Sequence, residues 1–178
     1  MRQLTDAERV RRFLHELARA AEDGARCYLT GGATAVLMGW RPTTIDVDVK
    51  LVPESDAMLR AIAQLKDALA INVELASPAD FIPELPGWAE RSVFVAQEGK
   101  LAVFHYDLYA QALAKIERGH AQDVGDVREL LRRSLVEPSR LRDLYDRIEP
   151  ELYRYPALHA PSFRAAVEEA LREAERLQ

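Results

Sequence analysis

Apolar and polar residues alternate strictly over one segment in the first third of the chain. Residues 45 to 51 place apolar side chains, beginning with Ile45, on one face of an extended segment, and Asp46, Asp48 and Lys50 on the other. This alternation is typical of a β-strand with one face in the core and one face exposed. The pattern therefore predicts a strand that presents two carboxylates side by side.

A glycine turn lies upstream of this strand. Residues 27 to 29 are apolar, Thr30-Gly31-Gly32 follows at once, and residues 33 to 38 have the composition of a short helix. The predicted order is strand, glycine turn, helix and then the strand with the aspartates.

Downstream, residues 71 to 75 alternate in the same way, with Asn72 and Glu74 at the polar positions. The remaining pattern predicts mainly helices, with one proline-rich loop and one hairpin. The predicted helices cover residues 5–22, 56–69, 107–118, 122–134, 138–148 and 162–177, the loop covers 77–88, and the hairpin pairs 92–96 with 101–105.

Length and composition indicate a globular protein with a real core, since 48% of the 178 residues are hydrophobic. We expect one compact unit, in which residues 1–106 form a core with its N-terminal helix and residues 107–178 form a helical region that completes the cleft. No apolar run approaches the ~18 residues that span a bilayer, and the charged start of the chain has no secretory apolar region. The expected protein is soluble and cytoplasmic, without a membrane partner.

The net charge limits the possible partners, and the cysteine content limits the possible disulfide and zinc sites. The net charge of -5 argues against general attraction to nucleic acid or anionic membranes, although a local basic face would still bind RNA. The single cysteine, Cys27, cannot form an internal disulfide, and no cysteine and histidine residues have the spacing of a zinc site.

The two aspartates predict a metal site. Carboxylates at positions i and i+2 of a strand lie on one face, where they repel each other unless a cation lies between them. Mg²⁺ or Mn²⁺ prefers such oxygen ligands and completes its shell with water and substrate phosphate. We expect Asp46, Asp48 and Glu74 to bind the metal, with Glu74 as a second-ion ligand or the base for an attacking hydroxyl.

Other residues are suited to the phosphates of a nucleotide. Gly31 and Gly32 permit close approach of the backbone, and the hydroxyl of Thr30 or Thr34 would add a donor. Further along, Lys115 and Arg118 lie on one face of a predicted helix, where they would project toward a triphosphate, and Asp123 and Asp126 open the helix that follows.

Simpler interpretations exist for each feature alone. A glycine pair is usually a turn, and an Asp-x-Asp strand is usually a solvated face. Lys115 and Arg118 would then pair within their exposed helix, with Glu117 or Gln111. The arginine-rich residues 128–147 are interleaved with acids, which favours a solvated helix face over an RNA-binding track. The order of the motifs, rather than any one of them, favours an active site.

The motifs resemble those of the nucleotidyltransferase superfamily with the polymerase-beta-like core. Its signature is a hydrophobic residue, a glycine pair or Gly-Ser, a short helix and then Asp-x-Asp, followed by a third carboxylate between hydrophobic residues. Here these are Leu29-Thr30-Gly31-Gly32, Ile45-Asp46-Val47-Asp48-Val49 and Val73-Glu74-Leu75. The resemblance implies an α/β (α+β) fold, with a small mixed β-sheet flanked by helices and a helical C-terminal region.

A narrower resemblance points to the AbiEii-like and MenT-like toxin nucleotidyltransferases. It rests on Gly-Gly-x-x-Ala, Arg41-x-Thr-Thr-x-Asp-x-Asp, Leu113-x-Lys115-x-x-Arg118 and Asp123-x-x-Asp126. In that group the downstream lysine and aspartate belong to the active site, which implies catalytic roles for Lys115 and Asp123. Nucleotide binding would fall to Thr30, Gly31, Gly32, Arg41, Lys115 and Arg118. This chain has Gly32 where that group commonly has serine.

The resemblance implies transfer of a nucleoside monophosphate from a nucleoside triphosphate to an acceptor hydroxyl. A toxin-like enzyme that acts on RNA or tRNA, with a cognate antitoxin, is the first interpretation. The alternatives are a non-catalytic nucleotide- or partner-binding scaffold of a toxin–antitoxin system and an antibiotic nucleotidyltransferase.

Overall fold

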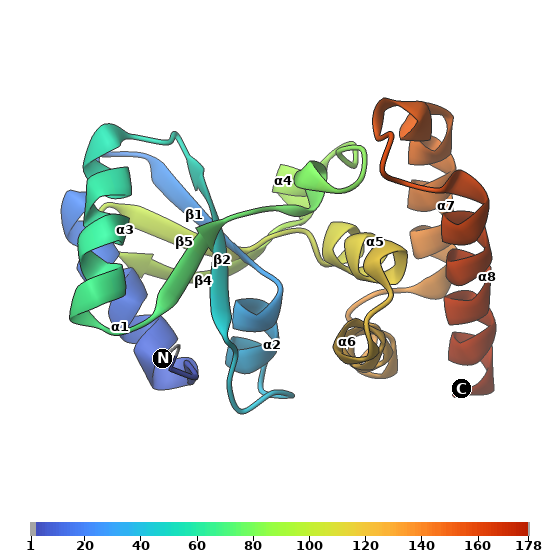
Figure 1. Ribbon diagram of the computed structural model, residues 1–178, viewed down its shortest axis with the longest axis horizontal. Helices are drawn as coiled ribbons and strands as arrows, with labels where there is room; N and C mark the ends of the chain where they lie inside the picture. The colour runs from blue at the N-terminus through green and yellow to red at the C-terminus, as the bar shows by residue number, and fades with distance from the viewer. Residues whose placement is uncertain (1–2, 178) are drawn as a thin grey trace. The chain divides into compact units, whose positions relative to one another are not determined.

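The computed structural model describes residues 3–177, which form two compact units (Figure 1). The first unit comprises Met1–Ser77 and Ser92–Tyr106, and the second comprises Pro78–Arg91 and Asp107–Gln178. The predicted boundary after residue 106 left residues 78–91 in the core. The structure instead groups them with the helices, because Arg91 pairs with Asp107 at 2.7 Å and the Tyr155 hydroxyl donates to the Ala79 carbonyl at 3.0 Å.

The first unit contains a five-stranded mixed sheet with the strand order β3-β2-β1-β5-β4. The strands are β1 (Ala25–Thr30), β2 (Asp46–Val52), β3 (Asn72–Leu75), β4 (Val93–Glu98) and β5 (Leu101–His105). The central strand β1 runs antiparallel to β2 and parallel to β5, β2 runs parallel to β3, and β4 and β5 form the predicted hairpin. The mixed α/β class that the sequence predicts is confirmed.

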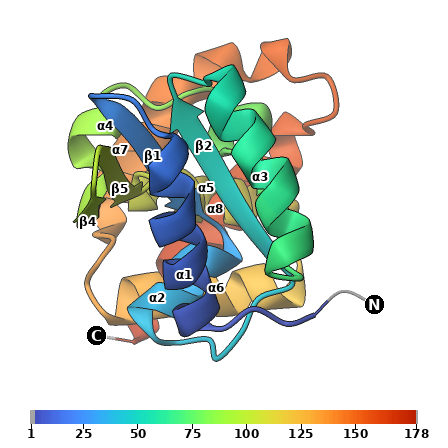
Figure 2. The same cartoon turned by 90° about the vertical axis from the view of Figure 1, so that its left-hand side faces the viewer.

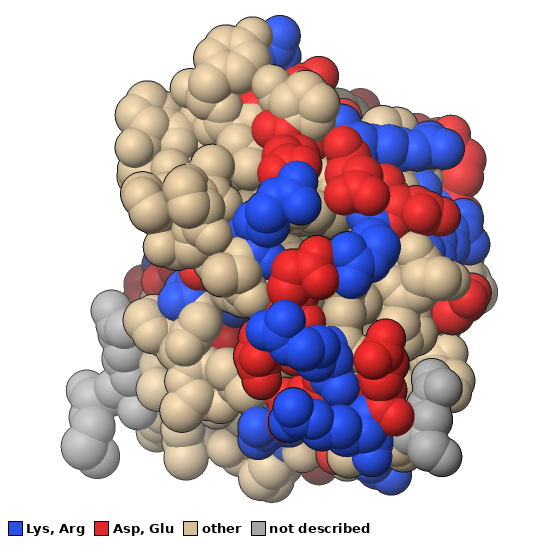
Figure 3. All heavy atoms as spheres, turned by 90° about the vertical axis from the view of Figure 1, so that its right-hand side faces the viewer, with Lys and Arg blue, Asp and Glu red and all other residues tan. Residues whose placement is uncertain are grey.

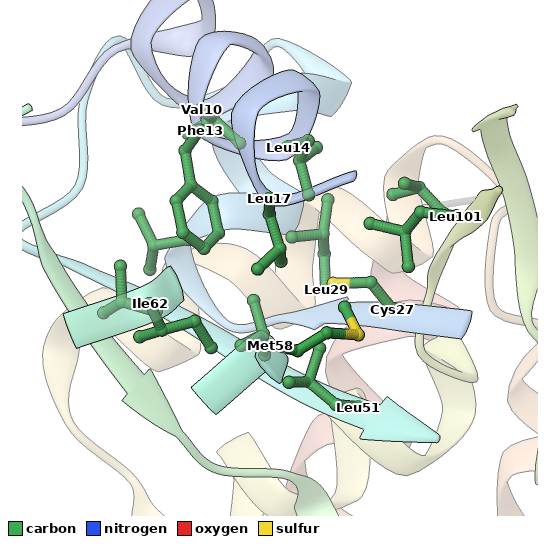
Figure 4. Packing of buried hydrophobic residues seen from close by; sticks show 14 of the residues in the cluster. Val10, Phe13, Leu14, Leu17, Cys27, Leu29, Leu51, Met58, Ile62 and Leu101 are labelled. Atoms are coloured by element: carbon green, nitrogen blue, oxygen red, sulfur yellow. The ribbon is translucent and has the colours of Figure 1, made fainter. Parts of the chain in front are cut away.

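Three helices of this unit pack on one face of the sheet (Figures 1 and 2). They are α1 (Ala7–Leu17), α2 (Gly32–Met38) and α3 (Asp56–Ala68), and a 3-10 turn (Ala18–Ala20) follows α1. The side chains of Asp6 and Ser55 cap α1 and α3 by accepting hydrogen bonds from backbone N–H groups. Figure 4 shows the resulting core, in which Phe13 and Leu17 of α1 and Met58 of α3 meet the apolar face of the strands.

The apolar face is the alternate set of strand residues that the sequence predicts. Cys27, Val47 and Val49 are fully buried in this core, and burial raises the pKa of the Cys27 thiol to about 12. Ile45 is an exception. We expected it on the core face, but β2 begins at Asp46 and the Ile45 side chain is 51% exposed. The alternation of apolar and polar residues starts at Ile45, one residue before the first residue of β2.

The second unit is helical. Its helices are α4 (Trp88–Arg91), α5 (Leu108–Arg118), α6 (Ala121–Arg132), α7 (Pro138–Ile148) and α8 (Ala160–Arg176), with 3-10 turns at Pro78–Asp80 and Glu149–Arg154. Asp107 caps α5, and Gly119 ends it in the left-handed conformation, which favours glycine. The helix α8 begins before Pro161, because proline is tolerated in a first helical turn.

Exposed arginines of this unit pair with acids rather than forming a uniform basic surface. Arg142 of α7 donates to Glu168 of α8 at 2.8 Å, and Arg128 of α6 donates to Glu173 of α8 at 2.7 Å. Figure 3 shows this mixture of basic and acidic side chains. It agrees with the interpretation of residues 128–147 as a solvated face.

Candidate active site

The register of the sheet places the predicted acidic residues together. Asp48 on β2 lies between Thr30 on β1 and Glu74 on β3, and Asp46 lies two residues along β2 from Asp48. All four point to the face opposite the helices, since Leu29, Val47, Val49 and Val73 point into the core. Asp46 and Asp48 are half-buried and Glu74 is exposed. Three carboxylates from two adjacent strands thus share one polar face.

Asn72 links two of these carboxylates. It lies opposite Asp46 in the parallel register, and its side-chain amide donates to the Asp46 carboxylate. The same amide nitrogen donates to Glu74 at 3.2 Å. Asn72 therefore links Asp46 on β2 to Glu74 on β3 across one face of the sheet, because a single amide group donates to both carboxylates.

The glycine pair fits closely against the aspartate strand. Gly31 has φ +63°, a conformation that favours glycine, and a Cβ atom there would lie 2.7 Å from Asp48 Oδ2. A Cβ atom on Gly32 would lie 2.0 Å from Thr44 Oγ1 and 3.4 Å from an Arg41 guanidinium nitrogen. Glycine at these positions therefore leaves room beside the Asp48 carboxylate and brings Arg41 next to the turn.

The Thr44 hydroxyl connects this turn to the aspartates. It donates to the backbone carbonyl of Asp46 at 2.9 Å, while the backbone of Thr44 pairs with Thr5 in both directions at 2.8 and 2.9 Å. The Thr44 side chain thus leaves no room for a Cβ atom at position 32, and it also holds Asp46, the first residue of β2. Serine at position 32 would collide with it.

Thr34 does not belong to the candidate site. We considered it a phosphate ligand, but its side chain is buried between α2 and the sheet, where its hydroxyl lies 3.2 Å from the Leu29 carbonyl and 3.0 Å from His105 Nδ1. His105 is buried as well, and this burial lowers its pKa to about 4. The pair joins α2 to the sheet from the core side.

Lys115, Arg118 and Asp123 form an ion cluster with Asp126 inside the second unit. Lys115 is buried, at 6% exposure, and its Nζ lies 2.6 Å from Asp126 and 3.4 Å from Asp123. Arg118 donates twice to Asp123, at 2.6 and 2.7 Å. The alternative of an exposed Lys115 paired with Glu117 or Gln111 is therefore wrong, because the partners of Lys115 come from the next helix.

The cluster favours the ionised form of the Asp123 carboxylate. Burial raises the pKa of Asp123, but hydrogen bonds and charges from Arg118 and Lys115 outweigh burial and lower that pKa below its ordinary value. Lys115 also lines a mainly apolar hollow of about 260 Å³ between α5, α6 and α8. In the second unit these residues have a clear structural role.

The polar face of the sheet has the donors that suit a hard divalent cation. Mg²⁺ is commonly held by one or two carboxylates together with substrate phosphates, and Asp46 and Asp48 match that requirement. Within residues 3–177, no three or more histidine, cysteine, aspartate or glutamate side chains are gathered as a complete metal site. A cation at Asp46 and Asp48 would therefore need further oxygen ligands from a substrate.

Sequence reasoning missed the roles of Thr44 and Asn72. Asn72 shares the parity of Asp46 and Asp48 on its strand, so its face was predictable, but its contact with Asp46 depends on the register between β2 and β3. Thr44 lies within the quoted Arg41-x-Thr-Thr motif, yet its contact with the glycine turn has no local signal.

Comparison with known proteins identifies the family of the chain and does not bear on individual site residues. None of the described helices is both long and apolar enough to cross a membrane. Searches of curated proteins and of solved structures found no significant match. A family match extends over residues 8–170, which include the glycine turn, the aspartate strand and the ion cluster. Because this match covers most of its length, the chain belongs to the family described as a nucleotidyltransferase of unknown function (DUF6036).

Proposed function

We propose that this protein transfers a nucleoside monophosphate from a nucleoside triphosphate to an acceptor hydroxyl in a reaction that depends on Mg²⁺ or Mn²⁺. The observation that carries the proposal is the row formed by Thr30, Asp48 and Glu74, with Asp46 beside it and Gly31 next to Asp48. Such a reaction depends mainly on positioning and charge neutralisation, so that a few carboxylates suffice.

In the proposed reaction, the acceptor oxygen attacks the α-phosphorus, a new P–O bond forms, and the bond to the pyrophosphate leaving group breaks. Asp46 and Asp48 would hold the divalent cation, which when bound neutralises charge on the phosphate oxygens. Glu74 lies in register with Asp48 at the exposed edge of this face, where its carboxylate would accept the proton of the attacking hydroxyl.

The glycine turn and Arg41 would bind the phosphates. Gly31 and Gly32 carry no side chain that would shield the backbone, and the Arg41 guanidinium lies beside Gly32. Contacts of Lys115 and Arg118 with the triphosphate, and a catalytic role for Asp123, remain predictions from the resemblance. The toxin-like role, the RNA or tRNA acceptor and a cognate antitoxin are likewise predictions from the resemblance.

The test is nucleotide transfer by Asp46→Asn and Asp48→Asn variants. Each substitution removes an anionic ligand and keeps nearly the same shape, so we expect loss of transfer with an unchanged melting temperature. The wild type is incubated with each labelled nucleoside triphosphate, Mg²⁺ and total cellular RNA, and transfer is read on a gel. Asp67→Asn, at an exposed position near the end of α3, is the matched control. Wild-type transfer by either site variant would refute the site.

A further inference from the structure

Three aromatic side chains stand in a row on the sheet face that carries the candidate carboxylates. Tyr28 on β1 is opposite Phe104 on β5, and Phe104 is opposite Phe94 on β4. The rings of Tyr28 and Phe104 stack with centroids 5.3 Å apart, and those of Phe104 and Phe94 meet edge to face at 5.7 Å. Phe94 is 58% exposed and Phe104 is half-buried.

Two cations accompany this row. The Arg26 guanidinium lies 5.9 Å from the centroid of the Phe104 ring, and Arg26 also donates to the Tyr28 hydroxyl at 3.5 Å. On the other side, Lys50 of β2 is opposite Tyr28. We refer to Arg26, Phe94 and Phe104 as the stacking surface.

The stacking surface lies on the polar face of the sheet and not on its core face. The neighbours of its members along each strand, Cys27, Val95 and Val103, pack in or against the core under the helices. In a chain of net charge -5, this part of the sheet combines the exposed ring of Phe94 and the half-buried ring of Phe104 with the positive charge of Arg26, whereas the Tyr28 ring behind them is buried at 2% exposure. Beside it on the same face are the acidic residues Asp46, Asp48 and Glu74.

This combination suits unpaired nucleobases. Aromatic rings and arginine planes stack on bases of any sequence, and cations beside them attract the phosphates of the strand. A large apolar side chain such as Phe94 on an edge strand otherwise invites aggregation, against which edge strands usually carry charge or proline. The exposure of Phe94 is therefore better explained by a ligand than by the stability of the fold.

Distance along the sheet separates this surface from the reacting nucleotide. Phe94 and Asp48 lie on strands three spacings apart, and Asp48 is two residues along β2 from the row of Phe94 and Phe104, which together correspond to roughly 16 Å. A stacked nucleic-acid strand rises about 3.4 Å per nucleotide, so about five nucleotides span this distance. The base of the reacting nucleotide, by contrast, is joined to its α-phosphate through a single ribose and would lie closer to the carboxylates.

We propose that the stacking surface binds unpaired bases of a single-stranded nucleic acid. With the proposed function, on which this part rests, that strand is the acceptor, and its terminal hydroxyl lies at Asp46 and Asp48 while its preceding bases stack on Phe104 and Phe94.

The test is binding of a short fluorescein-labelled single-stranded RNA, followed by anisotropy without a nucleoside triphosphate. Phe94→Ala should weaken binding about 5- to 150-fold, the range for loss of one base stack. Phe81→Ala is the matched control, because Phe81 is a phenylalanine of similar exposure, 48%, in the second unit. Phe94→Trp should bind at least as tightly as the wild type. An RNA with abasic residues should bind Phe94→Ala and the wild type equally.

Equal binding of the base-containing RNA by Phe94→Ala and the wild type would overturn the proposal, as would tighter binding of duplex RNA than of single strands. A loss of triphosphate affinity in Phe94→Ala without a loss of RNA affinity would assign the surface to the nucleotide base and overturn it too. If RNA binding falls as expected but the wild type transfers no nucleotide, the stacking surface is supported and the proposed function fails.

Discussion

Lowering the pH from 7 to 5 should destabilise the first unit through His105. This side chain is 5% exposed, and burial lowers its pKa from 6.5 to about 4. Below pH 6.5 the unfolded chain therefore binds a proton that the folded chain does not bind, and the free energy of unfolding falls with the pH. The loss starts near the unfolded pKa and is complete below the folded one.

The size of this effect follows from the two pKa values. At pH 5 the imidazole is mostly protonated in the unfolded chain and mostly neutral in the folded protein. The difference between 6.5 and about 4 then corresponds to a loss of about 2 kcal/mol between pH 7 and pH 5, and of roughly 3 kcal/mol when the titration is complete. The Asp123 carboxyl, whose pKa is lowered, stays ionised in this range and affects stability only at lower pH.

The assay is urea unfolding followed by circular dichroism at pH 7, 6 and 5, for the wild type and for His105→Gln. The variant should start from a lower stability, because it disturbs a buried contact with Thr34, but its stability should change little over this range. An equal loss in both proteins would refute the argument. Since Thr34 lies on α2, the first helix after the glycine turn, nucleotide binding should weaken in the same pH range.

Three further predictions concern the site and the ion cluster. Glu74→Gln should slow transfer by about 10²-fold while triphosphate binding survives, as kinetics and nucleotide titration would show, and equal turnover would make Glu74 a surface residue. Lys115→Met should lower the free energy of unfolding by about 3–5 kcal/mol, because it leaves buried carboxylates without their ammonium partner. The exposed control Lys100→Met should change the free energy of unfolding little, and similar values for the two variants would contradict the buried cluster. Gly32→Ala should lower the free energy of unfolding by about 1–3 kcal/mol, because the added Cβ atom collides with Thr44, and adding Thr44→Gly should recover part of that loss. If the effects of the two substitutions, measured by chemical denaturation, are strictly additive, the collision is refuted.

The elements and faces that depend on local pattern were predictable from the sequence. The strict alternation around Asp46 and Asp48 predicts their common face, because side chains of a strand point alternately to its two sides. Glu74 was placed by the same parity. The order of the strands in the sheet was not predictable from local pattern. The alignment of Thr30, Asp48 and Glu74 in one row depends on that order and was therefore not predictable either.

Contacts between residues far apart in sequence account for what was missed. Lys115 looks like a surface lysine within its own helix, and only the packing of α6 against α5 brings Asp126 to within 2.6 Å of it. The sequence predicts a proline-rich loop over residues 77–88 and leaves it in the core, but the pairing of Arg91 with Asp107 groups residues 78–91 with the helices. In both cases the decisive partner is a charge whose position depends on tertiary structure.

The chain passes between its two units three times, after residues 77, 91 and 106, and this route limits how the protein can be divided. A fragment that starts at Asp107 would lack Arg91, the cation that donates two hydrogen bonds to the fully buried Asp107 carboxylate. Such a fragment would leave that carboxylate buried without its cation or expose the start of α5, and either change opposes folding. Adding residues 78–91 as a separate peptide should restore the missing partner. The helical unit should therefore fold only when both of its chain segments are present, and no single cut of the chain provides them.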